Sequence, residues 1–137
     1  MKYDKTLMNT AKIWSNESYC DRKKVGAVIA QDSRIISTGY NGTISGSENC
    51  CEDEVQGKLI SKNTVVHAEA NAIMYAAKNG IKTDGCTLYV TMSPCVECAK
   101  MIIQSGIKRV VYSEQYRMTD GIDFLKEHNI DLQFYSL

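Results

Sequence analysis

The sequence lacks features that would divide it or give it a strongly charged surface. It has one proline in 137 residues, no low-complexity segment and no internal repeat, so no linker is visible and we expect one domain over residues 1–137. Lysine plus arginine equals aspartate plus glutamate at 16 each, which provides no basic field for a nucleic-acid partner. The composition therefore favours a small-molecule partner.

Long apolar runs are also absent. Charged side chains interrupt residues 1–20, so we expect neither a signal peptide nor a membrane-spanning segment. Six cysteines could form a disulfide scaffold in a small secreted protein, but their placement around a metal-binding pattern in an untargeted chain favours reduced thiols. We therefore expect a cytoplasmic protein without a membrane partner.

The apolar pattern predicts alternating helices and strands. Helices are expected at 4–18, 66–79, 95–105 and 120–128, and strands at 25–29, 34–38, 86–92, 109–112 and 131–135. The segment 42–62 is expected to be irregular. A strand, a helix and a strand in succession imply parallel pairing. The sequence therefore predicts an α/β fold with three layers, α/β/α, and a mixed sheet of about five strands.

Two short segments together provide three metal ligands and one free carboxylate. His67 and Glu69 stand two positions apart, and Cys95 and Cys98 follow Pro94 in a C-x-x-C pattern. Catalytic zinc takes imidazole and thiolate ligands and keeps its fourth position open for water. Glu69 could then transfer protons. The pattern resembles the H-x-E…P-C-x-x-C signature of zinc-dependent nucleobase deaminases.

The spacing explains how these ligands can meet. On a helix, Cys95 and Cys98 are neighbours on one face, about 5–6 Å apart at Cβ. Ser93 is predicted to be the N-cap of that helix, with Pro94 as its first residue. Positions two apart on a helix do not share a face, so His67 must lie at the start of its own helix.

Two other interpretations fit parts of the pattern. A C-x-x-C pair alone could be a redox pair or an ordinary helix face. A structural zinc in a binding module would need a fourth ligand, which Glu69 could provide. Replacing Glu69 with alanine separates these readings, because a catalytic site would keep its zinc and a structural site would lose it.

Beyond the metal pattern, the chain resembles the deoxycytidylate deaminases of the cytidine-deaminase-like superfamily, in their short viral and bacterial form. The similar segments are 25–29, 39–42, 49–51, 67–73, 93–100 and 105–108. Gly39-Tyr40-Asn41-Gly42 is typical of enzymes that act on dCMP. The resemblance implies a cytidine-deaminase-like fold and the conversion of dCMP and water to dUMP and ammonia, which supplies thymidylate synthesis.

The resemblance also implies roles for single residues. One zinc would be held by the His67 and cysteine ligands, while Glu69 transfers protons to the pyrimidine and the leaving amine. The backbone of Ala68 would read the pyrimidine carbonyl, Asn41 would orient the sugar and base, and Tyr116 would lie at the phosphate. Asn41 could instead form a simple turn, and Tyr116 could be a surface aromatic.

A phosphate also requires cations, and the basic run before the first predicted strand offers Arg22, Lys23 and Lys24, of which at least one is expected to bind the phosphate. Such a run often marks a solvated face. Guanidinium forks match phosphate oxygens, so Arg22 is the first choice.

Regulation is the next implication of the resemblance. Many relatives are homohexamers that respond to dCTP and dTTP, with Mg²⁺ accompanying the nucleoside triphosphate. The effector site would comprise Tyr40, Asn41 and Gly42. Tyr75 and Lys78 would complete it, although lysine lacks the bidentate fork of the family's arginine.

A second zinc occurs in some viral relatives, and Cys20 and Cys50 match its cysteine positions. The segment between them and the metal helix lacks a histidine, and Val65 stands where the family has a glutamate. These differences argue against a second zinc unless Cys51 or nearby acids replace the missing ligands. The alternative chemistry is a nucleoside or base deaminase with the same zinc centre, and the neutral composition gives a nucleic-acid deaminase less support.

Overall fold

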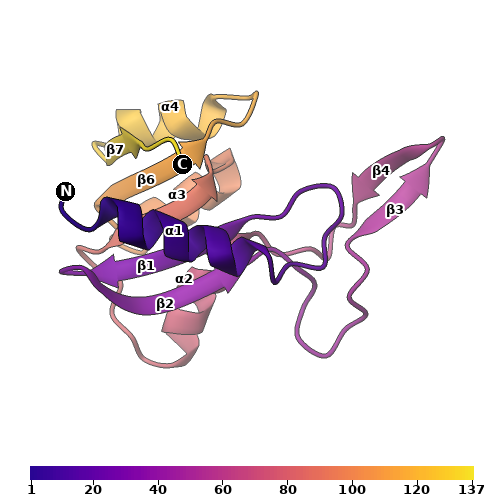
Figure 1. Ribbon diagram of the computed structural model, residues 1–137, viewed down its shortest axis with the longest axis horizontal. Helices are drawn as coiled ribbons and strands as arrows, with labels where there is room; N and C mark the ends of the chain where they lie inside the picture. The colour runs from indigo at the N-terminus through magenta and orange to yellow at the C-terminus, as the bar shows by residue number, and fades with distance from the viewer.

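The computed structural model describes residues 1–137 and consists of a layered body with one projecting hairpin (Figure 1). Its four helices are α1 (Asp4–Ser15), α2 (Ala68–Lys78), α3 (Val96–Gln104) and α4 (Asp120–Glu127). Its seven strands are β1 (Gly26–Gln31), β2 (Arg34–Tyr40), β3 (Glu52–Val55), β4 (Lys58–Ser61), β5 (Thr87–Met92), β6 (Arg109–Glu114) and β7 (Asp131–Phe134).

Five of the strands form the central sheet in the order β2-β1-β5-β6-β7. Strand β1 is antiparallel to both β2 and β5, whereas β5, β6 and β7 run parallel. The β1–β2 hairpin turns through Asp32 and Ser33, both with positive φ. The predicted mixed sheet and the parallel unit β5–α3–β6 are therefore confirmed.

The alternation of side chains along β1 shows how the layers form. Ala27 and Ile29 point toward a core that includes residues of α2, α3 and α4, whereas Val28 and Ala30 pack against α1. Because successive strand residues face opposite sides, one apolar strand can fill two cores. Helix α1 thus covers one face alone, in front of the sheet in Figure 1, and the other three helices cover the opposite face.

The prediction that 42–62 is irregular is wrong for its second half, where β3 and β4 form a separate two-stranded sheet. This hairpin turns at Gln56 and Gly57, whose φ angles are 50° and 77°. Apart from Glu52, which is buried, its strand residues are exposed. Without a buried face, the sequence carries none of the apolar alternation that identifies a strand.

A buried ionic cluster fixes α1 to the sheet. The Asp4 carboxylate accepts hydrogen bonds from two guanidinium nitrogens of Arg109, at 3.0 and 2.7 Å, and from the Tyr89 hydroxyl at 2.8 Å. Asp4 and Arg109 are 3% and 7% exposed. The Arg109 guanidinium holds the pKa of the Asp4 carboxyl well below its usual range. No helix of the protein has both the length and the apolar character that crossing a membrane requires.

Candidate functional site

The first predicted ligand, His67, lies at the start of α2. It is the N-cap residue, with an extended backbone (φ −70°, ψ 157°), and the helix begins at Ala68. The extended conformation releases the His67 side chain from the helical spacing, so it and Glu69 in the first turn can line one cavity. The predicted position of His67 is confirmed.

A glycine on β2 allows this helix start to sit against the sheet. A Cβ on Gly39 would lie 2.5 Å from the carbonyl oxygen of Ala68 and 2.7 Å from the backbone nitrogen of Ala72. Both distances are shorter than a carbon side chain tolerates. Because Gly39 has no side chain, the start of α2 can pack closely against β2. This close packing determines where His67 and Glu69 lie.

The second pair of ligands lies at the start of α3. Cys95 is the N-cap residue, and Cys98 is buried in the first turn. The prediction of Ser93 as the N-cap is wrong. Ser93 is buried two residues earlier, and its hydroxyl oxygen accepts a hydrogen bond from the backbone N–H of Tyr116 at 2.7 Å. The hydroxyl that was expected to cap the helix instead fixes the loop that carries Tyr116.

The three donor atoms converge to a separation that suits zinc. The Nδ1 atom of His67 lies 3.3 Å from Sγ of Cys98 and 3.5 Å from Sγ of Cys95, and all three donors lie within 4.8 Å of one another. Tetrahedral zinc with bonds of about 2.1 Å to nitrogen and 2.3 Å to sulfur would hold such ligands about 3.6 Å apart. The donor set therefore fits one zinc ion.

The environments of the two thiols shift their pKa values in opposite directions. The pKa of the Cys95 thiol is lowered to about 3, mainly by the hydrogen bond from Cys98 and, to a smaller extent, by His67. The pKa of Cys98 is raised because its thiol donates to Cys95 and is buried. Zinc requires both sulfurs as thiolates and the imidazole as neutral, so zinc binding must release protons.

Glu69 differs from the ligands in its environment. Its side chain is buried, and loss of solvation raises the pKa of the carboxyl to about 7. An acid with a pKa near neutrality can both accept and donate a proton at working pH. The structure therefore places a candidate proton carrier in the same cavity as His67 and Cys95.

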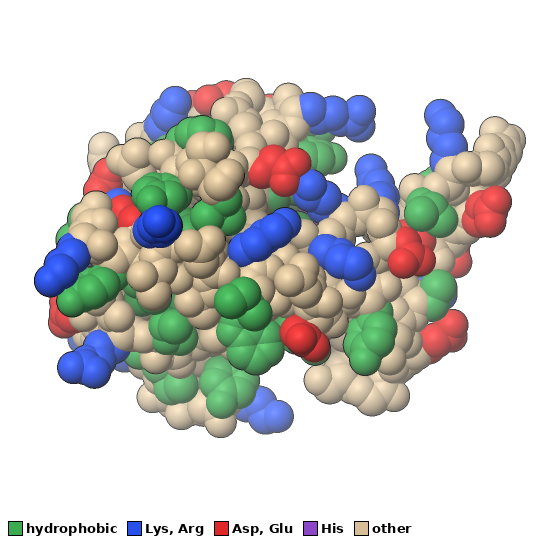
Figure 2. All heavy atoms as spheres, in the orientation of Figure 1, with side chains coloured by type: hydrophobic (Ala, Val, Ile, Leu, Met, Phe, Trp, Pro, Cys, Tyr) green, Lys and Arg blue, Asp and Glu red, His purple; other side chains and the backbone are tan.

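The cavity has a volume of about 330 Å³. It brings together four further predicted substrate-binding residues, namely Arg22, Asn41, Ala68 and Tyr116. Lys24 does not line it, because its ammonium group donates to the carbonyl oxygen of Ser18. Figure 2 shows Lys and Arg side chains on the surface beside the gap between the layered body and the projecting hairpin.

Asn41 has structural contacts that the sequence did not indicate. Its side-chain oxygen accepts from the Val25 N–H at 2.9 Å, and its Nδ2 donates to the Lys23 carbonyl at 2.7 Å. These bonds fix the chain where it enters β1. A substrate could therefore use only the second proton and the remaining lone pair of this amide.

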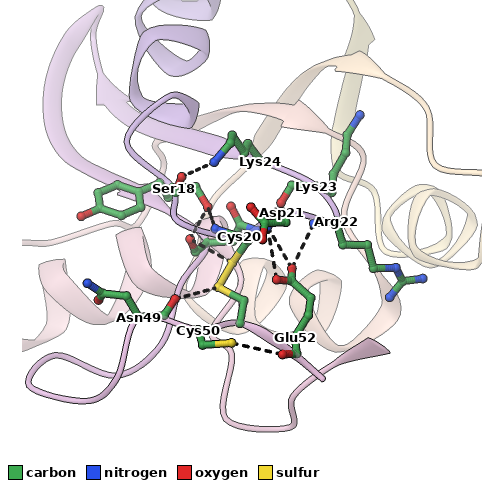
Figure 3. Close-up of a disulfide and its surroundings, with 12 residues drawn as sticks. Ser18, Cys20, Asp21, Arg22, Lys23, Lys24, Asn49, Cys50 and Glu52 are labelled. Atoms are coloured by element: carbon green, nitrogen blue, oxygen red, sulfur yellow. Dashed lines mark hydrogen bonds between the residues drawn. A yellow bond between two sulfur atoms is a disulfide. The ribbon is translucent and has the colours of Figure 1, made fainter. Parts of the chain in front are cut away.

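The cavity also contains a buried carboxylate, that of Glu52, which the sequence did not indicate. Glu52, at the start of β3, accepts hydrogen bonds from the backbone N–H groups of Asp21 and Arg22 at 3.0–3.2 Å (Figure 3). Lys23, the middle residue of the predicted basic run, also lines the cavity beside Arg22. Figure 3 shows the Arg22 and Lys23 side chains leaving the same side of the segment, while Lys24 turns toward Ser18.

The expectation of reduced thiols is wrong for one pair. Cys20 and Cys51 form a disulfide, whereas Cys50, the predicted partner of Cys20 at a second zinc, is an exposed free thiol. Neighbouring residues in an extended chain point to opposite sides, so only one of the two adjacent cysteines can face Cys20. Cys20, Cys51 and Glu52 lie within 4.8 Å of one another. In the disulfide form, however, the two sulfurs are joined and Glu52 is bound to backbone N–H groups.

The residues predicted for effector binding lie outside the cavity, with the exception of Asn41. The ring of Tyr40 stacks on Trp14 with centroids 6.3 Å apart. Gly42 forms an isolated bridge with Val66. On α2, the side chains of Tyr75 and Lys78 are exposed.

Replacing Gly121 with alanine should disturb the metal ligand Cys95, although the two residues are far apart in the sequence. A Cβ at this position in α4 would strike the carbonyl oxygen of Pro94 and lie 2.8 Å from the carbonyl carbon of Cys95. We expect a loss of about 1–3 kcal/mol in the free energy of unfolding, together with weaker zinc retention in a chelator competition. Gly42→Ala is the stability control, because its added methyl meets no atom within 4 Å. Equal stability of the two variants would contradict this prediction.

Comparison with known proteins adds independent information. Residues 1–114 match the sequence model of the cytidine and deoxycytidylate deaminase zinc-binding region. The deoxycytidylate deaminase of Enterobacteria phage T4 is 40% identical in an alignment that is 149 residues long. This alignment covers 81% of this chain and 77% of that protein. The enzyme of the same name from Mycobacterium phage D29 is 37% identical, with 82% of this chain and 95% of that protein covered.

A solved structure extends the similarity to the fold. The dCMP deaminase of cyanophage S-TIM5, determined in complex with dCMP and dUMP, superimposes with a TM-score of 0.92 at 41% identity. The match covers 98% of this chain and 97% of that one. The layers, the sheet and the connections described above are therefore those of a solved protein.

Proposed function

Because the chain belongs to the cytidine and deoxycytidylate deaminase family, we propose that it catalyses the zinc-dependent hydrolytic deamination of dCMP to dUMP and ammonia, in one domain over residues 1–137. The observation that carries this proposal is the convergence of His67, Cys95 and Cys98 in one site with the buried Glu69 carboxyl. The cyanophage protein with the same fold binds dCMP and dUMP, the proposed substrate and product.

The residues of the chain divide the chemistry between them. His67, Cys95 and Cys98 would hold the zinc, which when bound supplies a Lewis acid that lowers the pKa of water to about 7. Glu69 accepts one proton of the attacking water and delivers it to N3 of the cytosine ring. It then passes the other to the departing amine, so C4 gains an oxygen and the amine leaves as ammonia.

The cavity also supports the choice of a nucleotide. Arg22 provides a guanidinium group that matches phosphate oxygens, and the Tyr116 loop forms part of the same cavity. The Ala68 backbone would read the pyrimidine carbonyl and Asn41 would orient the sugar and base, and both residues line the same cavity. Glu52 holds the backbone of Arg22 in place.

Regulation and assembly form the finer part of the proposal. A homohexamer in the cytoplasm would bind dCTP and dTTP, with Mg²⁺, through the residues that the resemblance indicates, namely Tyr40, Asn41, Gly42, Tyr75 and Lys78. The exposure of Tyr75, at 53%, supports this assignment because an aromatic ring must be accessible to stack on a base. Sedimentation with and without dTTP, together with rate measurements in both nucleotides, tests it.

A substrate comparison tests the main proposal. The purified protein should deaminate dCMP with a higher kcat/KM than deoxycytidine, cytosine or dCTP. A preference for deoxycytidine would make the protein a nucleoside deaminase with the same metal chemistry. A protein that binds zinc but deaminates none of the four would be a structural zinc protein.

The metal and thiol contents provide a separate prediction. Since Cys20 and Cys51 are joined, we expect one zinc per chain and four free thiols in the denatured, non-reduced, metal-free protein. Elemental analysis and thiol titration measure these numbers. Six thiols together with two zinc ions per chain would instead place a second metal at Cys20, Cys51 and Glu52.

A further inference from the structure

An ion pair joins a lysine that lines the cavity to a glutamate beside the Tyr116 loop. The Lys23 ammonium lies 2.8 Å from both carboxylate oxygens of Glu114. Lys23 lines the cavity and stands just before β1, whereas Glu114 ends β6 two residues before Tyr116, which also lines it. The pair therefore connects the basic segment to the loop of the proposed phosphate-end tyrosine.

The backbone on each side of this pair is fixed. On one side, the Lys23 carbonyl accepts from the Asn41 side chain at 2.7 Å. On the other, the Glu114 carbonyl accepts from the Ser93 N–H at 2.8 Å, and the Ser93 hydroxyl accepts from the Tyr116 N–H. Because both segments are held, the ion pair can open by side-chain rotation alone.

The pair itself is weak enough to exchange. Its side chains are 44% and 55% exposed, and exposed pairs contribute little to stability because water and salt screen them. A phosphate monoester carries close to two negative charges near neutral pH, whereas Glu114 carries one. A phosphate in the cavity would therefore compete well for the Lys23 ammonium.

We propose that Lys23 determines specificity for the phosphate group of the substrate, and that Glu114 holds its ammonium until the nucleotide arrives. This inference rests on the proposed function and adds Lys23 to Arg22 as a cation that separates a nucleotide from a nucleoside. On binding, Lys23 exchanges the carboxylate for phosphate oxygens. Glu114 then remains near the phosphate as a like charge, which limits affinity for the substrate and the product.

Opposite effects of two substitutions test the exchange. Lys23→Met should lower kcat/KM for dCMP by about 10- to 100-fold and leave kcat/KM for deoxycytidine unchanged. Glu114→Gln should raise kcat/KM for dCMP by about two- to fivefold through KM, because it frees Lys23 and removes a like charge. The gain should shrink as salt is added, and deoxycytidine should show no gain.

The Lys62–Asp53 pair supplies matched controls for net charge. It joins an exposed carboxylate to a lysine outside the cavity, so Lys62→Met and Asp53→Asn should change neither substrate's kcat/KM. Lys23→Arg should retain most of the dCMP activity. Zinc content and the thermal midpoint of each variant show that the fold is intact.

The outcomes separate this inference from the proposed function. If the unmodified protein prefers dCMP and Lys23→Met keeps that preference, the specificity role is wrong and the function stands. A Glu114→Gln variant with unchanged or raised KM for dCMP would overturn the exchange. If the unmodified protein prefers deoxycytidine, the proposed function itself fails. In the event that Lys23→Met does not fold, the Glu114→Gln and Lys23→Arg results decide the question.

Discussion

Replacing Glu69 with glutamine should reduce kcat for dCMP by about 100- to 10,000-fold, the usual contribution of a positioned acid and base. Glutamine keeps the size of the side chain and fills the same buried position, but it cannot accept or deliver a proton. The free-protein carboxyl already has a pKa of about 7 because it is desolvated. The loss should therefore appear in kcat and much less in KM.

The metal distinguishes this role from a structural one. His67, Cys95 and Cys98 make up the donor cluster without Glu69, so the Glu69→Gln variant should retain one zinc per chain. Glu97→Gln is the matched control, since Glu97 lies between the two cysteines but its side chain is 79% exposed. Loss of zinc from the Glu69 variant would make this residue a ligand. Activity within a few fold of the unmodified protein would assign proton transfer to another group.

Replacing Asp4 with alanine should produce a large loss of stability although Asp4 lies outside the site. The Arg109 guanidinium would remain buried without the carboxylate that binds it through two hydrogen bonds. Removing one partner of a buried pair costs about 3–5 kcal/mol, a large part of a typical total of about 5–15 kcal/mol. Urea unfolding, followed by its midpoint and slope, measures the change.

A second acidic partner of Arg109 provides a control for the Asp4 substitution. Its Nε also lies 3.6 Å from Asp131, whose side chain is 73% exposed. Asp131→Ala should therefore cost about 1 kcal/mol or less. A similar loss for both substitutions would contradict the importance of burial.

The Asp4 contribution should also depend on pH in a defined direction. The pKa of the Asp4 carboxyl is lower in the folded protein than its ordinary value of 3.8. The unfolded chain thus takes up the proton first as pH falls. The stabilisation is complete above about pH 5 and is lost progressively below pH 4, where the stability of the unmodified protein should approach that of Asp4→Ala. A constant difference between the two down to pH 2 would contradict this assignment.

Most of the fold and the metal-binding cluster could be predicted from local sequence patterns. The spacing of Cys95 and Cys98, and the need for His67 to stand at a helix start, depend on only a few neighbouring residues and on helix geometry. The same holds for the central strands, whose apolar residues identify them. These predictions agreed with the structure because nothing distant competes with them.

The features that the sequence did not reveal depend on distant partners. The capping prediction for Ser93 was wrong because Tyr116 provides a competing backbone donor. The disulfide selects Cys51 over the adjacent Cys50, and Lys23 meets Glu114 across the sheet. A single sequence contains no signal for such pairs. The β3–β4 hairpin was missed for a different reason, namely that its strands bury almost nothing.

The strand order has a consequence for how the protein acquires its metal during synthesis. Strand β1 lies between β2, its neighbour in sequence, and β5, which leaves the ribosome only after the hairpin and α2 have emerged. Pairing of β1 with β5 therefore requires closure of a long loop. Contacts between residues that are far apart in the sequence form slowly during folding. His67 also leaves the ribosome before either metal-binding cysteine does. We expect zinc to enter late, when β5 docks and carries the start of α3 to a helix that is already in place.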